Sequence, residues 1–113
     1  MIVLAIVDDL VFQAKIQAVA VPLGVEVRIA KNFTQAQEAW ADPAVVIVDL
    51  SLASADPLEL VRALRVQHPA VPIIGYGSHV QTELLAQARA AGCTRVLPRS
   101  AFAQQLPSLL API

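Results

Sequence analysis

The sequence predicts an α/β domain with a five-stranded parallel sheet, strand order 2-1-3-4-5, and helices on both faces of that sheet. Five short runs rich in Val and Ile alternate with longer amphipathic segments, which is typical of repeated β-α units. The first, third and fourth runs are almost continuously apolar, as expected for strands covered on both faces. For five strands in this alternation, 2-1-3-4-5 is the common order, and ligands bind beyond the carboxyl ends of the strands.

The predicted strands are short segments spread along the whole chain: 2–7, 25–30, 44–48, 71–75 and 94–97. The second alternates apolar and polar residues from Val25 to Ile29, which favours a strand near an edge of the sheet. Apolar stripes at helical spacing lie between the strands, and Pro or Gly follows them as a stop signal. The stripes are Phe12-Ile16-Val19-Ala20, Phe33-Ala36-Ala39-Trp40, Leu60-Val61-Leu64 and Val80-Leu84-Ala88-Ala91. A last helix is predicted after Ser100 as its N-cap, and Pro107 is expected to end or kink it early.

Length and composition indicate one domain over residues 1–113 and exclude several function classes. The chain is 57% hydrophobic, but none of its apolar runs approaches the roughly 20 residues of a membrane span. A net charge of −1 gives no electrostatic reason to bind nucleic acid or an anionic membrane. The single cysteine, Cys93, excludes an internal disulfide and a multi-cysteine metal site. No secretory leader precedes the first strand, so a cytoplasmic location is expected.

Carboxylates follow two of the buried strands at the point where each strand ends. Asp8 and Asp9 come after the first strand, and Asp49 follows the third. Because strands 1 and 3 are neighbours in the predicted order, we expect the three side chains to meet in one pocket. Carboxylates at such distances raise each other's pKa unless a cation is present. Mg²⁺ suits the site, since it takes a few carboxylate oxygens and keeps water and phosphate ligands.

A carboxylate in such a pocket is also a candidate nucleophile toward phosphorus, because it can carry the transferred group as an acyl phosphate. The protein then has to position the phosphoryl group and neutralise its charge.

Over almost its whole length the chain resembles the receiver domain of two-component response regulators. The resemblance rests on Asp8-Asp9 after the first strand, on Val45-Val46-Ile47-Val48-Asp49-Leu50, on the helix segment from Asp56 to Arg65, on Pro72-Ile73-Ile74 and on Ala90-Ala91-Gly92-Cys93. It implies the flavodoxin-like receiver fold, with Asp49 as phosphoacceptor. It further implies that Asp8, Asp9, Asp49 and the backbone carbonyl of Ser51 hold Mg²⁺.

Several positions of the receiver pattern are occupied by other residues here. The switch Ser or Thr after the fourth strand aligns with Gly77, which has no hydroxyl, and Ser78 follows one residue later. The Lys after the fifth strand aligns with Arg99, which keeps the charge but not the shape of an ammonium. Ser100 replaces the usual Pro, and Val96 stands where the family has its switch aromatic residue.

The resemblance implies a phosphorelay signalling module, not an enzyme with its own substrate. Its partners would be a histidine kinase or phosphotransfer protein, docking on the first helix, and an output protein. Since the chain ends at Ile113, we expect a stand-alone receiver whose output depends on docking. The face of helix 4, strand 5 and helix 5 is the candidate docking and homodimer surface, with Arg89, Arg95 and Phe102.

Other interpretations remain open at this point. The chain fits a degenerate receiver that binds partners without phosphorylation, because the switch hydroxyl is missing. A small-molecule-binding or catalytic domain of the same fold is a third alternative, although no cofactor-binding loop supports it. Individually, Asp8 or Asp9 fits a helix N-cap, Arg99 a surface residue and Ser78 a turn residue.

Overall fold

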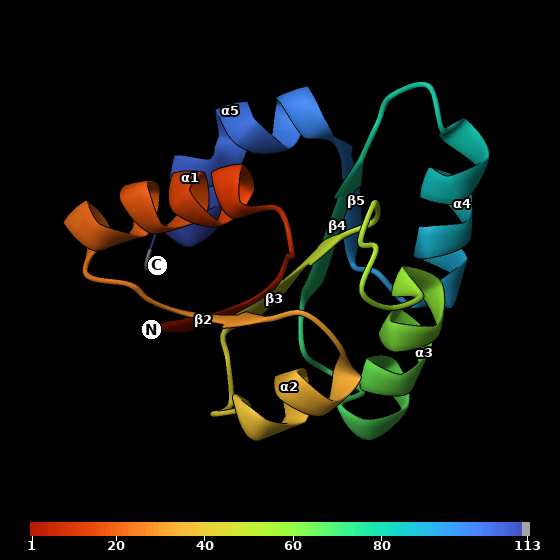
Figure 1. The fold of residues 1–113 in the computed structure, drawn as a ribbon, viewed down its shortest axis with the longest axis horizontal. Coiled ribbons are helices and arrows are strands. Elements are labelled where there is room, and N and C mark those ends of the chain that lie inside the picture. Colours follow the sequence, from red (N-terminus) through yellow and green to blue (C-terminus); the bar gives the residue numbers. More distant parts are fainter. Residues whose placement is uncertain (112–113) are drawn as a thin grey trace.

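The computed structural model describes residues 1–111 and contains five strands that alternate with helices (Figure 1). The strands are β1 (Ile2–Ile6), β2 (Glu26–Ala30), β3 (Val45–Asp49), β4 (Ile73–Gly77) and β5 (Arg95–Pro98). The helices are α1 (Leu10–Ala20), the 3₁₀ turn η1 (Val21–Leu23), α2 (Phe33–Glu38), α3 (Pro57–Gln67), α4 (Thr82–Ala91) and α5 (Arg99–Leu110).

All neighbouring strands are parallel, in the order β2-β1-β3-β4-β5, which confirms the predicted topology. Helices α1 and α5 cover one face of the sheet, and α2, α3 and α4 cover the other (Figure 1). β2 lies at an edge, as its alternating sequence predicts, while β1, β3 and β4 are buried on both faces. No helix among residues 1–111 is both long and apolar enough to cross a bilayer.

Alternate residues of each strand supply two separate hydrophobic clusters. In β1, Val3 and Ala5 face α1 and α5, whereas Leu4 and Ile6 face the other helix layer. This two-residue period follows from the pleat of a β-strand. Asp49 shares the α1/α5 face with Ile47, because the two residues are separated by one period.

Two expectations about the element ends are wrong. β4 runs two residues later than predicted, so Gly77 closes the strand instead of lying in the following loop. α4 begins at Thr82, so Val80 lies before the helix and is 72% exposed. Leu85 is buried in the core in place of Val80. The shifts arise because tertiary pairing and packing, which a single sequence does not contain, set element ends.

α5 also differs from its predicted form. It begins at Arg99 after Pro98, without a side-chain N-cap, and continues through Pro107 to Leu110. Pro107 is on the exposed side of the helix, while Phe102, Leu106 and Leu110 are fully buried on the core side. The free energy gained by burying these three side chains offsets the loss of the backbone hydrogen bond that proline cannot donate.

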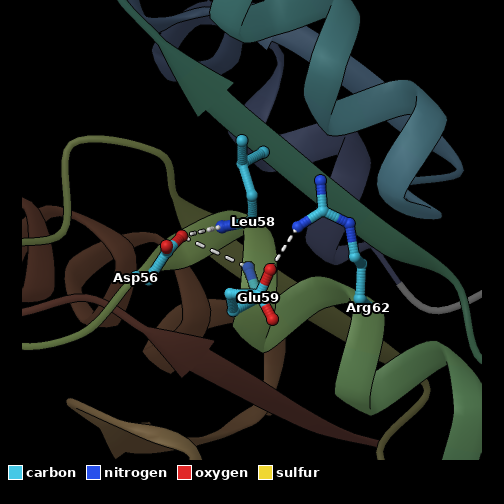
Figure 2. A network of polar contacts seen from close by, with 4 residues as sticks. All are labelled: Asp56, Leu58, Glu59 and Arg62. Carbon is cyan, nitrogen blue, oxygen red and sulfur yellow. Dashed lines mark hydrogen bonds and ion pairs between the residues drawn. The ribbon is translucent and has the colours of Figure 1, made fainter.

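The start of α3 fixes the segment that follows β3. The Asp56 carboxylate accepts hydrogen bonds from the N–H groups of Leu58 at 3.0 Å and Glu59 at 3.2 Å (Figure 2). Pro57 occupies the first turn of the helix. Glu59 also pairs with Arg62 at 2.6 Å on the exposed side. This N-cap defines the length of the loop between Asp49 and α3, which carries several partners of the candidate site.

Candidate functional site

The candidate site lies where β1 and β3 end side by side. Ile6 pairs with Val48 in the parallel register, so Asp49 and the Asp8-Asp9 pair follow at neighbouring strand ends. The sheet order therefore brings Asp8 and Asp9 close to Asp49, although they lie 41 and 40 positions before it in the sequence.

Asp49 is buried, with only 4% of its surface exposed, and it is the sole buried charged residue in the part of the chain that the structure describes. Its Oδ1 accepts a hydrogen bond from the Ser51 N–H at 2.8 Å. Burial raises the pKa of the Asp49 carboxyl, and the nearby Asp8 charge adds to this; the Ser51 N–H and the Arg99 charge oppose it without cancelling it. The carboxylate is thus poorly solvated and incompletely neutralised.

Asp8 joins the end of β1 to the loop after β3. Its Oδ2 accepts hydrogen bonds from the N–H groups of Ala53 and Ser54, both at 3.0 Å. Desolvation alone would raise the pKa of Asp8, but these backbone donors outweigh it and hold the pKa below its ordinary value. Asp8 therefore stays ionised beside Asp49.

Asp9 is the N-cap of α1. Its Oδ1 accepts hydrogen bonds from the N–H groups of Val11 at 2.9 Å and Phe12 at 3.3 Å. The capping interpretation of one member of the acidic pair is therefore confirmed for Asp9.

The expectation that three carboxylates converge on one point is not met in this structure. Within residues 1–111, no three His, Cys, Asp or Glu side chains are grouped closely enough to hold a metal ion. The reason is local, because Asp8 and Asp9 direct their carboxylates at backbone N–H groups. The donor set, all oxygen and mostly anionic, still fits Mg²⁺ chemically. The backbone hydrogen bonds occupy Oδ2 of Asp8 and Oδ1 of Asp9, so the second oxygen of each carboxylate could still coordinate an ion after a side-chain rotation.

Arg99 is half-buried at the start of α5 and lies near Asp49 without bonding to it directly in the described part of the chain. Its Nη2 donates a hydrogen bond to the Ser51 Oγ at 3.1 Å, and its charge acts on Asp49 electrostatically. The hydrogen bond to Ser51 links β5 to the loop after β3. Arg99 thus sits where a cation can balance a charge added to Asp49.

Gly77 and Ser78 occupy the end of β4 and the start of the next loop. A Cβ placed on Gly77 would meet Leu50 and Leu85 atoms at 3.4 Å, which is ordinary contact, so packing does not demand glycine here. The Ser78 Oγ accepts a hydrogen bond from the Val80 N–H at 3.4 Å, in accord with a turn residue.

A cavity of about 320 Å³ opens beside this end of the sheet, between α1, the loop after β4 and the start of α5. Its lining is aromatic and cationic: Phe12, Lys15, Ser78, His79, Arg99, Ser100 and Ala103. An anionic group approaching Asp49 from this side would meet Lys15 and Arg99.

Tyr76 is a site residue that the sequence gives no strong reason to select. It pairs with Asp49 in the β3–β4 register, so both side chains point to the same face of the sheet. Its side chain is fully buried, and its hydroxyl lacks a hydrogen-bond partner. Burial raises the Tyr76 pKa far above its ordinary value, and the Asp49 charge adds to the shift. The one available signal was a tyrosine in an otherwise aliphatic and glycine-containing strand.

One member of the predicted docking surface is misplaced. Phe102 is fully buried and stacks on Tyr76, with ring centroids 4.3 Å apart, because it lies on the core side of α5. Arg89 and Arg95 are exposed as expected.

The 2-1-3-4-5 parallel sheet with acidic residues after β1 and β3 has the arrangement of a receiver domain, and sequence comparison agrees. The family model of the response regulator receiver domain matches residues 3–111. The chain belongs to this family, which confirms the resemblance found in its sequence. The curated proteins contain no match to the chain.

Solved structures share the fold at low sequence identity. The receiver domain of NtrX from Brucella abortus is 23% identical with a TM-score of 0.83, and the match covers 96% of this chain and 93% of that one. The receiver domain of a sensor histidine kinase from Pseudomonas aeruginosa, solved with a magnesium ion in its active-site cleft, is 23% identical with a TM-score of 0.81 and the same coverage. In the longer NtrX structure, at 22% identity and TM-score 0.85, the match spans only 25% of that protein.

Proposed function

We propose that this receiver domain accepts a phosphoryl group on Asp49, with Mg²⁺ held by Asp49, Asp8 or Asp9 and the backbone carbonyl of Ser51. The observation that carries the proposal is the burial of Asp49 at the end of β3 with no ion-pair partner among the described residues. A buried carboxylate of this kind costs stability, so a chain selected for its core alone gains nothing from it. Its place at the carboxyl end of a central parallel strand is where such sheets bind ligands.

In the proposed reaction, an oxygen of the Asp49 carboxylate attacks the phosphorus of a phosphohistidine. The P–N bond breaks, the P–O bond of an acyl phosphate forms, and the departing imidazole takes up a proton from solvent. Arg99 balances the charge that Asp49 gains, and Lys15 attracts the donor to the cavity. Bound Mg²⁺ would neutralise charge on the phosphoryl oxygens. The chain is in this role an acceptor module and not an enzyme.

The proposed donor is a histidine kinase or phosphotransfer protein that docks on α1. Leu10 and Val11 support this partner, because they are 72% and 70% exposed and directly follow Asp9. Exposed apolar side chains beside a reactive group are typical of a docking surface.

The direct test is incubation with acetyl phosphate and Mg²⁺, followed by intact-mass measurement. We expect the mass of one phosphoryl group to be added to the wild type and not to Asp49→Asn. The matched control is Glu38→Gln, which removes an exposed carboxylate on α2 and should be modified like the wild type. A modification that persists in Asp49→Asn would refute the assignment.

A second candidate function is a degenerate receiver that binds its partner without phosphorylation. Two observations favour it: Asp8 and Asp9 are already engaged by backbone N–H groups, and Gly77 has no hydroxyl. Under this alternative, Asp49→Asn leaves partner binding unchanged and acetyl phosphate adds no mass. Under the leading proposal, Asp49→Asn abolishes the phosphorylation-dependent change in binding.

A further inference from the structure

The Tyr76 hydroxyl is a buried donor that lies near the Asp49 carboxylate without forming a well-aligned hydrogen bond to it. It is the one side-chain N or O atom within residues 1–111 that is fully buried and forms no hydrogen bond. Leaving such a group unpaired is unfavourable, so native proteins usually provide a partner or use the group. Phenylalanine would fill the same space without this cost.

The hydroxyl is held in place by its ring. Tyr76 stacks on Phe102, with ring centroids 4.3 Å apart and an interplanar angle of 8°, and on Phe12, with centroids 5.0 Å apart and an angle of 23°. Phe12 and Phe102 also stack on each other, with centroids 6.3 Å apart. These contacts restrict the ring to one orientation and keep its polar end fixed. Since Tyr76 and Asp49 are register partners on the same face, a group attached to Asp49 extends along the same side of the sheet as the tyrosine side chain.

The other hydroxyls near Asp49 are absent or not fully buried. Gly77, at the switch position, has none. The Ser78 Oγ accepts from the Val80 N–H, and the Ser51 Oγ accepts from Arg99. Within residues 1–111, Tyr76 alone places a fully buried hydroxyl on the Asp49 face, whereas the O–H donors of Ser51 and Ser78 can bond to water.

We infer that the Tyr76 hydroxyl donates a hydrogen bond to a phosphoryl oxygen on Asp49, in place of the hydroxyl that Gly77 lacks. The inference rests on the proposed phosphorylation of Asp49 and assigns a positioning role within that site. The unmodified Asp49 carboxylate lies near the hydroxyl without forming a well-aligned hydrogen bond, and a phosphoryl oxygen on Asp49 would supply that acceptor. Phosphorylation is thereby coupled to the Phe12–Tyr76–Phe102 stack, and through it to α1 and α5.

The test uses beryllofluoride with Mg²⁺ as a stand-in for the phosphoryl group on the full chain. Wild type, Tyr76→Phe and Ser78→Ala are titrated and followed by backbone amide shifts. We expect Tyr76→Phe to bind roughly tenfold more weakly, as for the loss of one hydrogen bond to a charged group, and Ser78→Ala to bind like the wild type. The unfolding midpoint of Tyr76→Phe in urea, without ligand, should be equal or higher, because an unpaired buried hydroxyl is removed.

Tyr76 is the only tyrosine of the chain, and Trp40 absorbs in the same region, so a difference spectrum against Tyr76→Phe isolates the tyrosine signal. Beryllofluoride should shift its near-ultraviolet spectrum in the wild type and in Ser78→Ala. A rescue variant completes the design: Tyr76→Phe combined with Gly77→Ser should recover most of the lost affinity, since a Cβ fits at Gly77.

The outcomes separate the two claims. If the wild type binds beryllofluoride but Tyr76→Phe binds equally well, or tyrosine absorbance does not respond, the role of Tyr76 is refuted and phosphorylation of Asp49 stands. If Ser78→Ala loses the affinity instead, Ser78 is the donor. If neither the wild type nor any variant binds, the proposed function is refuted and this inference with it.

Discussion

The Asp8 carboxylate accepts a hydrogen bond from the N–H of Ala53, 45 residues away, at 3.0 Å. This contact closes the β3–α3 loop onto the end of β1. The same carboxylate is a proposed Mg²⁺ ligand, so a rotation that brings it to a metal ion would also change these contacts to the loop.

We predict that Mg²⁺ changes the amide shifts of Ala53 and Ser54, the two donors to Asp8, together with that of Ser51. Asp8→Asn should lower Mg²⁺ affinity by about tenfold or more, because it removes an anionic ligand. An NMR titration measures both effects. Glu38→Gln is the control, and its Mg²⁺ affinity should equal that of the wild type. Equal Mg²⁺ affinity in Asp8→Asn would exclude Asp8 as a ligand.

Asp9 has two roles that substitution can separate. Asp9→Ala should lower the free energy of unfolding by about 1 kcal/mol, because α1 loses its N-cap. Asp9→Asn keeps a capping oxygen and should retain most of that stability, yet bind Mg²⁺ more weakly. Urea unfolding without metal and a separate Mg²⁺ titration measure the two quantities. If Asp9→Asn binds Mg²⁺ like the wild type, Asp9 is only a cap.

Burial of Asp49 predicts an unusual pH dependence of stability. Its folded pKa is raised above the ordinary 3.8, so between these two values the folded state binds more protons than the unfolded state. The Asp49 contribution to stability therefore falls as pH rises through this window. In metal-free buffer, Asp49→Asn should therefore be more stable than the wild type at neutral pH.

That advantage should disappear below the ordinary pKa, where Asp49 is protonated in both states. Urea unfolding of both proteins across acidic and neutral pH measures the difference and cancels contributions common to both, including that of Asp8. A wild type more stable than Asp49→Asn at neutral pH would contradict the argument.

Arg99 should accelerate modification of Asp49 through its charge. Arg99→Gln keeps hydrogen-bonding capacity toward Ser51 but removes the charge. We expect the rate at which acetyl phosphate modifies Asp49 to fall by about tenfold or more in this variant. Arg99→Lys should retain part of the rate. Arg95→Gln is the matched control, since Arg95 is exposed and bonds to Gln105 on the surface. An unchanged rate in Arg99→Gln would show that the Arg99 charge has no role in the modification of Asp49.

Arg65 stabilises the opposite end of the sheet. Its guanidinium donates to the backbone carbonyls of Gly92, His68, Pro69 and Val71, at distances from 2.6 to 3.2 Å. Arg65→Ala leaves these carbonyls without their donor and should cost about 2–3 kcal/mol of unfolding free energy.

The control for Arg65 lies one turn earlier on the same helix. Arg62→Ala breaks only the exposed pair with Glu59 and should cost below about 0.5 kcal/mol (Figure 2). Urea unfolding compares the two variants. Equal losses would mean that the carbonyl contacts of Arg65 contribute no more than a surface ion pair.

By itself, the sequence determined the fold class, the strand order and the position of Asp49 at a strand end. These follow from periodicity and from the connection rules of parallel sheets, which act on local pattern. The family likewise follows from short motifs, each made of residues that are neighbours in the sequence.

Only the tertiary structure decided what the site residues contact. Three features depend on packing between segments that are distant in the sequence. Asp8 accepts hydrogen bonds from the loop after β3, Phe102 is buried, and α5 continues past Pro107. The pairing of Tyr76 with Asp49 depends on strand register, and the predicted β4 was two residues early. Register is set by the fit of whole strands and helices against one another, a long-range property that local patterns do not specify.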